Sequence, residues 1–181
     1  PGCAFGTGTH QTTQLCMKAL EKYMNKGDKV ADIGMGSGIL SILAKKLGAT
    51  SVYGCDTDDT VIDVAKENAK KNGIKVLQEK YPPLEGNVPD IPIDGVYFEL
   101  GSADKINDKF DFVCANILHF VLAEIMGDLK NLMKTGAMMS LSGILDEKKQ
   151  MVIDAYEKEN LELVEEIHQD QWTSFVVKRI D

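Results

Sequence analysis

The stretch ADIGMGSGIL at residues 31–40 constrains this chain most, because it joins an apolar strand to a helix through three alternating glycines. Glycines at the end of a strand let the backbone turn sharply and let a ligand approach without meeting a Cβ atom. The helix that follows offers unpaired N–H groups to a polar or anionic ligand. The stretch therefore predicts the floor of a nucleotide-type cofactor site. It departs from the Gly-x-Gly-x-x-Gly pattern of dinucleotide-binding loops, since Ile39 stands where the later glycine would be.

Short β-branched runs alternate with amphipathic helical runs along the rest of the chain. Strands are expected at residues 30–33, 51–55, 96–100, 110–115, 137–142, 161–168 and 172–178. Strand, helix and strand in succession predict parallel pairing with a right-handed crossover. Only a few polar residues separate the last two strands, which predicts an antiparallel hairpin. The expected fold is α/β: a doubly wound, mostly parallel sheet of seven strands that ends in an antiparallel hairpin.

Helices are expected before the first strand and between the later ones. The periodicity predicts them at residues 39–47, 59–72, 121–133 and 147–160. Asp59 is placed to cap the second of these, and a turn is expected at residues 134–136. Four of the five prolines fall between Pro82 and Pro92, which predicts an irregular surface insertion over residues 79–94.

Composition limits the class of protein. A chain of 181 residues, 44% of them hydrophobic, is expected to form one domain over residues 1–181. The net charge of −8 disfavours direct contact with nucleic acid and favours a basic partner. No apolar run approaches the roughly 20 residues of a bilayer span, so no membrane partner is expected. Four cysteines without Cys-x-x-Cys spacing suit a cytoplasmic protein with no disulfide frame and no metal site.

Asp56 ends the second expected strand, beside the glycine stretch. The carboxyl ends of neighbouring parallel strands face one crevice, where an acid can accept the hydroxyls of a ribose. The alternative role is to cap the next helix, but Asp58 and Asp59 are nearby and spare for that task. We therefore expect Asp56 to bind a ribose.

The chain starts at Pro1 in a run of glycines and threonines that reads GCAFGTGTHQTT at residues 2–13. A threonine at the end of this run is expected to cap the first helix. The N–H and hydroxyl groups of the run suit a polar ligand, with Phe5 available to cover an aromatic part of it. The alternative is an ordinary flexible terminus. A start without methionine suggests a piece of a longer protein.

Seven strands with a terminal hairpin, a glycine loop after the first strand and an acid after the second resemble the Rossmann-like class I S-adenosylmethionine-dependent methyltransferase fold. More narrowly, AFGTGTH (4–10), DIGMGSGIL (32–40), ANIL (115–118) and LSGIL (141–145) resemble the methyltransferase family of ribosomal large-subunit protein eleven. The glycine loop is shared by many methyltransferases. The first segment combined with ANIL is more particular to this family.

The resemblance implies a set of cofactor contacts. S-adenosylmethionine would be bound by Thr13, Gly34, Gly36, Asp56 and Asn116, and covered by a loop of Phe5, Gly6, Thr7 and Gly8. Ser102, after the third strand, would touch the adenine. Family members also carry an N-terminal domain that recognises the ribosomal protein, and we expect this domain to be absent here. Cofactor binding is expected to survive without it, and substrate recognition is not.

Methyl transfer from a sulfonium is an in-line displacement, so alignment of the reactants and exclusion of water can supply most of the catalysis. We expect Asn116 to orient the attacking amine, although it could instead cap a helix. His10 is a weaker candidate for a proton acceptor. We expect His119, His168 and Trp172 to be structural.

The acceptor is expected to be a lysine or α-amino group of a basic ribosomal protein. Methyltransferases of planar amides or bases on this fold often carry Asn-Pro-Pro-Tyr after the fourth strand, whereas this chain has Asn116-Ile117-Leu118-His119. Three alternatives stay open: methylation of another protein or a small molecule, an NAD-type oxidoreductase, and a cofactor-binding domain without turnover.

Overall fold

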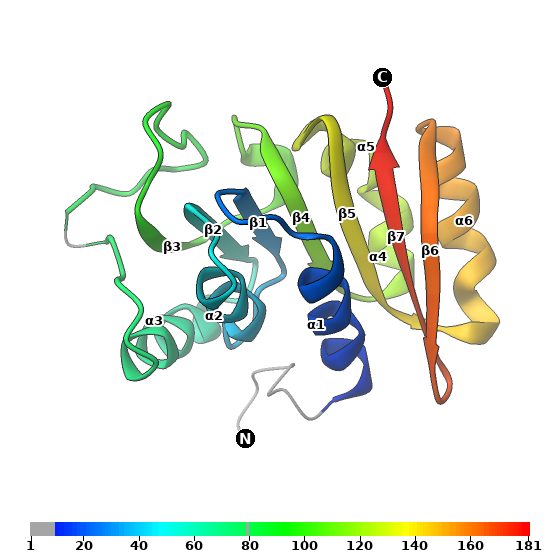
Figure 1. Ribbon diagram of the computed structural model, residues 1–181, viewed down its shortest axis with the longest axis horizontal. Helices are drawn as coiled ribbons and strands as arrows, with labels where there is room; N and C mark the ends of the chain where they lie inside the picture. The colour runs from blue at the N-terminus through cyan, green and yellow to red at the C-terminus, as the bar shows by residue number, and fades with distance from the viewer. Residues whose placement is uncertain (1–9, 79) are drawn as a thin grey trace.

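One sheet of seven strands forms the centre of the computed structural model, which describes residues 10–78 and 80–181 (Figure 1). The strand order is β3-β2-β1-β4-β5-β7-β6. The strands are β1 Lys29–Ile33, β2 Ser51–Asp56, β3 Gly95–Leu100, β4 Phe110–Asn116, β5 Met133–Leu145, β6 Leu161–Gln169 and β7 Trp172–Arg179. The strands β1 to β5 pair in parallel, and β7 pairs antiparallel with both β5 and β6. The expected fold class, the number of strands and the terminal hairpin are confirmed.

Helices cover both faces of this sheet (Figure 1). One face carries α1 Gln11–Tyr23, α2 Ile39–Lys46 and α3 Ile62–Lys71, and the other carries α4 His119–Glu124, α5 Met126–Asn131 and α6 Lys149–Lys158. Side chains along a strand alternate between faces, so Val30 packs under the first set of helices while Ala31 and Ile33 pack under the second. Three short 3₁₀ turns complete the fold: η1 Asp59–Val61, η2 Ala103–Lys105 and η3 Asp146–Lys148.

Several element boundaries differ from the expected ones. The helix predicted over residues 121–133 is two helices, which meet at Ile125. The turn predicted at residues 134–136 lies within β5, where the pairing slips between Phe110–Met133 and Phe112–Met138 and leaves a bulge. A periodic sequence does not show such a break, because the hydrophobic spacing continues through it.

The predicted helix caps also need correction. The cap of α1 is His10, whose Nδ1 accepts a hydrogen bond from the Thr12 N–H at 3.2 Å, so a threonine does not cap this helix. At the third helix the cap is Asp58 instead of Asp59, and its carboxylate accepts from the Thr60 N–H at 2.9 Å. This helix begins with the 3₁₀ turn η1 and continues as α3.

The proline-rich segment, defined here as residues 80–94, contains no helix or strand, as its prolines predict. It is not, however, an insertion that lies only on the surface. Leu84, Val88 and Ile93 are buried in the same core as α4, α5 and α6. The segment therefore covers part of a sheet face that a helix would otherwise cover. It is preceded by an isolated parallel bridge between Val76 and Val96.

Three cysteines of the described chain lie on separate elements of the core. Cys16 on α1, Cys55 on β2 and Cys114 on β4 are free thiols and fully or almost fully buried. Burial raises the pKa of Cys16 and of Cys55 to about 12, and it also raises the pKa of Cys114. Among the helices of the described residues, none has the length and apolar character that a bilayer crossing requires.

Candidate cofactor site

A cavity of about 560 Å³ opens where the carboxyl ends of β1, β2, β3 and β4 meet. This volume lies within the range typical of small-molecule sites. Parallel strands bring these ends to one edge of the sheet, so loops that are distant in sequence share one space. The lining residues are Ile33, Gly34, Gly36, Asp56, Thr57, Asp58, Val61, Gly101, Ser102, Ala103, Asp104, Asn116, Ile117, Leu118, Val121, Ile125, Gly143 and Trp172.

The glycine loop is fastened to the end of β2. The N–H groups of Gly34 and Met35 both donate to the Cys55 carbonyl, at 2.9 and 3.1 Å. One carboxylate oxygen of Asp56 accepts from the Gly36 N–H at 3.0 Å, and the other accepts from the Asp58 N–H at 2.9 Å. Asp58 does the capping that was expected of a spare acid. Asp56, the last residue of β2, holds the glycine loop, and each of its oxygens keeps a further lone pair for a ligand.

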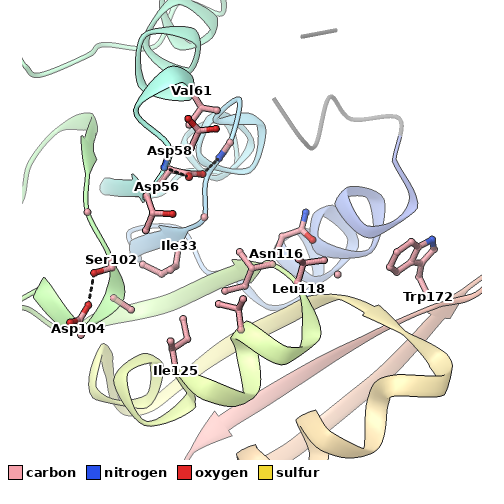
Figure 2. A pocket seen from close by; sticks show the side chains of 18 residues that line it. Ile33, Asp56, Asp58, Val61, Ser102, Asp104, Asn116, Leu118, Ile125 and Trp172 are labelled. Carbon is pink, nitrogen blue, oxygen red and sulfur yellow. Dashed lines mark hydrogen bonds between the residues drawn. The ribbon is translucent and has the colours of Figure 1, made fainter. Parts of the chain in front are cut away.

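The cavity is acidic. Asp56, Asp58 and Asp104 line it, and the described lining residues include no lysine, arginine or histidine. Figure 2 shows these acids with Ser102 on one side, and Asn116, Leu118 and Trp172 on the other. Ser102 donates a hydrogen bond to Asp104. Within the described chain no group of three or more His, Cys, Asp or Glu side chains is placed to hold a metal ion.

Asn116 is the most buried polar side chain that lines the cavity, with 7% of its surface exposed. Its Nδ2 lies 3.5 Å from the Thr13 hydroxyl, a long hydrogen bond. Its Oδ1 is buried and has no hydrogen-bond partner within residues 10–78 and 80–181. A buried acceptor without a partner is costly, which favours a ligand donor at this position.

Two glycines let the backbone after β4 approach the loop and β5. A Cβ atom on Gly34 would overlap the Ile117 side chain, and one on Gly143 would lie 2.5 Å from the Ile117 carbonyl oxygen. Both glycines also have φ in the left-handed region, at 71° and 89°. The Ile117 N–H donates to the Ser142 carbonyl at 3.2 Å. These contacts fix the chain immediately after Asn116.

Trp172 was expected to have only a structural role at the hairpin, but the structure places it in the lining of the cavity. Its ring meets the His10 ring edge to face, with centroids 5.4 Å apart. His10 caps the first helix, and Trp172 begins the last strand. The sequence gives no periodic signal for this meeting, because it depends on β7 inserting beside β5.

The structure brings together five of the predicted site residues. Gly34, Gly36, Asp56, Ser102 and Asn116 all line the cavity. Thr13 does not line it: this side chain is fully buried and meets Asn116 from behind. Phe5, Gly6, Thr7 and Gly8 lie outside the described residues. The remaining lining residues were not predicted, among them Asp58, Asp104, Gly143 and Trp172.

Asp32, one residue before the end of β1, is fully buried beside the glycine loop. Burial raises the pKa of this carboxyl to about 6, opposed by the Ser41 hydroxyl, which donates to it at 2.6 Å. Between pH 3.8, the ordinary pKa of an aspartate, and about pH 6, the folded protein therefore keeps a proton that the unfolded chain has lost. Stability from this group is therefore highest at low pH and is lost as the pH rises toward 6.

We expect Asp32→Asn to remove this pH dependence. Relative to the variant, the wild-type free energy of unfolding should fall by roughly 2 kcal/mol between about pH 4 and about pH 7. Urea unfolding at a series of pH values measures the difference. Asp90→Asn, at an exposed site, is the matched control and should run parallel to the wild type. An Asp32→Asn curve that also runs parallel would contradict the assignment.

Two solved structures with the same architecture are named as methyltransferases. A ribosomal protein L11 methylase from Lactobacillus delbrueckii subsp. bulgaricus is 30% identical, with a TM-score of 0.81 over 96% of this chain and 81% of that one. A tRNA methyltransferase from B. subtilis is 18% identical, with a TM-score of 0.67 over 91% of this chain, and shows the fold alone. The strand order and the cavity beside the glycine loop are those of the class I methyltransferase fold.

The family follows from sequence. The family model "Ribosomal protein L11 methyltransferase (PrmA)" matches residues 1–180, so this chain belongs to that family. The ribosomal protein L11 methyltransferase of Dictyoglomus thermophilum is 38% identical over 181 residues, which are 100% of this chain and 54% of that protein. The one of Thermotoga neapolitana is 38% identical over 99% of this chain and 61% of that protein. The chain thus spans about half the length of these curated relatives.

Proposed function

We propose that this chain is an S-adenosylmethionine-binding domain that transfers a methyl group to an amino group of a basic protein. The acceptor we propose is a lysine ε-amino or α-amino group of ribosomal protein L11, acted on in the cytoplasm. Family membership supports the ribosomal substrate, since the relatives carry that name. The site geometry supports the cofactor and the kind of acceptor.

The observation that carries the proposal is the charge of the cavity. Three carboxylates line it, and its described lining holds no cationic side chain. A pyrophosphate would meet like charges there, which opposes binding of NAD or a similar dinucleotide. A sulfonium and an α-amino group are cations, so a site whose described lining is acidic and holds no cationic side chain favours S-adenosylmethionine.

The residues present fit this cofactor. Asp56 offers two carboxylate lone pairs for the hydroxyls of a ribose. Ile33, Val61 and Ala103 provide apolar surface for an adenine, next to Ser102 and Asp104. The Oδ1 of Asn116, which has no partner among the described residues, offers an acceptor to an N–H donor. We propose that Thr13 acts through Asn116, and that Phe5, Gly6, Thr7 and Gly8 cover the site.

When bound, S-adenosylmethionine supplies a methyl carbon attached to a positively charged sulfur, which departs with the bonding electrons as a neutral thioether. The protein has to align the amine with that carbon and exclude water. An amine attacks only as the neutral form, so its proton must leave first. No described side chain of the cavity is a histidine or lysine that could take this proton, so we assign its removal to water or to an acidic side chain of the site.

Asn116 is the residue we propose to orient the amine. Its buried Oδ1 can accept one amine hydrogen and so direct the nitrogen lone pair elsewhere, toward the carbon that it attacks. Trp172 adds an aromatic face at the same side of the cavity, suited to a cationic alkylammonium before or after transfer. Leu118, which lines the cavity and is 56% exposed, offers apolar surface to an aliphatic side chain.

Calorimetric titration with S-adenosylhomocysteine, the demethylated product, tests the cofactor assignment. We expect binding of this product and no binding of NAD. Tight binding of NAD without a response to S-adenosylhomocysteine would overturn the proposal in favour of an oxidoreductase.

Transfer itself is tested with tritium-labelled methyl donor. The full-length protein and the 181-residue chain are each incubated with ribosomal protein L11. We expect label in L11 with the full-length protein and much less with the shorter chain. Cofactor binding without label from either would leave a binding domain and contradict the enzymatic part.

A further inference from the structure

The proline-rich segment touches the cavity wall from behind. The Gly86 carbonyl accepts a hydrogen bond from the Asn107 N–H at 2.7 Å. A Cβ atom on Gly86 would overlap the Lys105 carbonyl oxygen and lie 2.8 Å from the Lys105 carbonyl carbon. The backbones of the segment and of the end of η2 are therefore in direct contact. A glycine is required at this position for space as well as for its φ of 84°.

Glu99, near the end of β3, holds Gly86 from the other side. One of its carboxylate oxygens accepts from the Gly86 N–H at 2.9 Å and from the Tyr53 hydroxyl, and the other accepts from the Glu85 N–H at 3.1 Å. A carboxylate bound by two neighbouring N–H groups fixes the backbone that carries them.

Two stacked tyrosines support the same region. The rings of Tyr53 and Tyr97 are parallel within 3°, with centroids 6.2 Å apart. The Tyr97 hydroxyl donates to the Pro82 carbonyl at 3.0 Å and accepts from the Leu84 N–H at 3.1 Å. The segment is thus tied to β3 by the Tyr97 hydroxyl and the Glu99 carboxylate, which bond it at Pro82, Leu84, Glu85 and Gly86.

The turn that the segment supports is part of the cavity. Ser102, Ala103 and Asp104 line it, and the Ser102 carbonyl accepts from the Lys105 N–H at 3.0 Å. A shift of Lys105 or Asn107 would therefore move these three residues. Ala103 also packs in the same core as Leu84 and Val88.

We infer that the proline-rich segment braces the η2 wall of the cavity, with Gly86 and Glu99 as positioning residues, and so sets the affinity for the nucleoside half of the cofactor. The inference rests on the proposed function, which places the adenosine against Ser102, Ala103 and Asp104. Neither positioning residue lines the cavity itself. Their effect on binding must act through the wall.

The test compares Gly86→Ala with Gly136→Ala. Gly136 has a φ of 86°, close to that of Gly86, but a Cβ atom there would meet no atom of the described residues within 4 Å. Both variants acquire the same backbone strain, and only Gly86→Ala pushes on η2. Calorimetry with S-adenosylhomocysteine and with methylthioadenosine, which retains the nucleoside half, should show dissociation constants raised about tenfold for Gly86→Ala. Gly136→Ala should match the wild type for both ligands.

Glu99→Gln provides a second measurement if Gly86→Ala does not fold. It keeps the shape of the side chain but exchanges one acceptor oxygen for an NH₂ group, so it should weaken both ligands to a smaller extent. In the full-length enzyme, we expect both variants to raise KM for the methyl donor and to leave kcat unchanged. Wild-type affinity in the folded Gly86→Ala or Glu99→Gln variant would overturn the inference and leave the proposed function intact. Failure of the wild type to bind S-adenosylhomocysteine would overturn both.

Discussion

Replacement of Asp56 by Ala is expected to raise the dissociation constant for S-adenosylhomocysteine by about 100-fold. The substitution removes the acceptor that we assign to the ribose hydroxyls. It also releases the N–H groups of Gly36 and Asp58, which the carboxylate holds at 3.0 and 2.9 Å. The glycine loop is then less ordered before binding, so the free energy of ordering it weakens the binding of the ligand. Isothermal titration calorimetry measures the constant directly.

Two further variants separate these effects. Asp59→Ala removes a neighbouring exposed acid that does not line the cavity, and it should bind like the wild type. Asp56→Asn retains one acceptor oxygen and places an NH₂ group toward one of the two backbone N–H groups, so an intermediate affinity is expected. Equal affinities for Asp56→Ala and Asp59→Ala would remove Asp56 from the site.

Gly34→Ala is expected to cost about 4 kcal/mol in the free energy of unfolding. The alanine has to keep a left-handed backbone conformation, and its Cβ atom overlaps the Ile117 side chain. Ile117 follows Asn116 directly, so we also expect the displaced chain to bind S-adenosylhomocysteine more weakly. Urea unfolding gives the first quantity and calorimetry the second.

A double-mutant cycle tests the cause of this loss. Ile117→Ala removes the overlapping carbon, so the double variant Gly34→Ala/Ile117→Ala should be more stable than the sum of the single effects by about 2 kcal/mol. Gly143→Ala, combined with Ile117→Ala in the same way, is the matched control. Its Cβ atom meets the Ile117 carbonyl oxygen, which Ile117→Ala leaves in place, so the effects of this pair should add. Additive effects in the first pair would show that Gly34 is needed for its backbone conformation alone.

The sheet could be predicted from the sequence, as could five of the eighteen residues that line the cavity. The sequence predicts that Asp56 and Gly34 lie side by side, because parallel strands bring their carboxyl ends to one edge of the sheet independently of the loops between them. Asn116 and Ser102, which follow β4 and β3 in the same crevice, were implied as cofactor contacts by the resemblance to the methyltransferase family. The strand ends alone predict a nucleotide-type cofactor, and the resemblance to the methyltransferase family narrows this expectation to S-adenosylmethionine.

What the sequence leaves undetermined depends on contacts between distant loops. The burial of Leu84 and Val88 depends on how an irregular segment folds back over β3, and no periodicity records that path. Trp172 reaches the cavity only because β7 inserts between β5 and β6. The cap at His10 replaces a more common capping residue, so residue preferences pointed to the wrong side chain.

The three buried thiols on α1, β2 and β4 can report how often each of these elements opens locally. A thiol with a pKa of about 12 inside the core has almost no thiolate to react while the structure is closed. The rate at which a disulfide reagent labels each cysteine therefore measures how often its element opens. With Cys3 replaced by Ser, labelling at Cys16 compared with Cys55 and Cys114 would show whether α1 detaches before the central strands separate. Ligand binding across the ends of β2 and β4 should slow labelling of the two strand cysteines together.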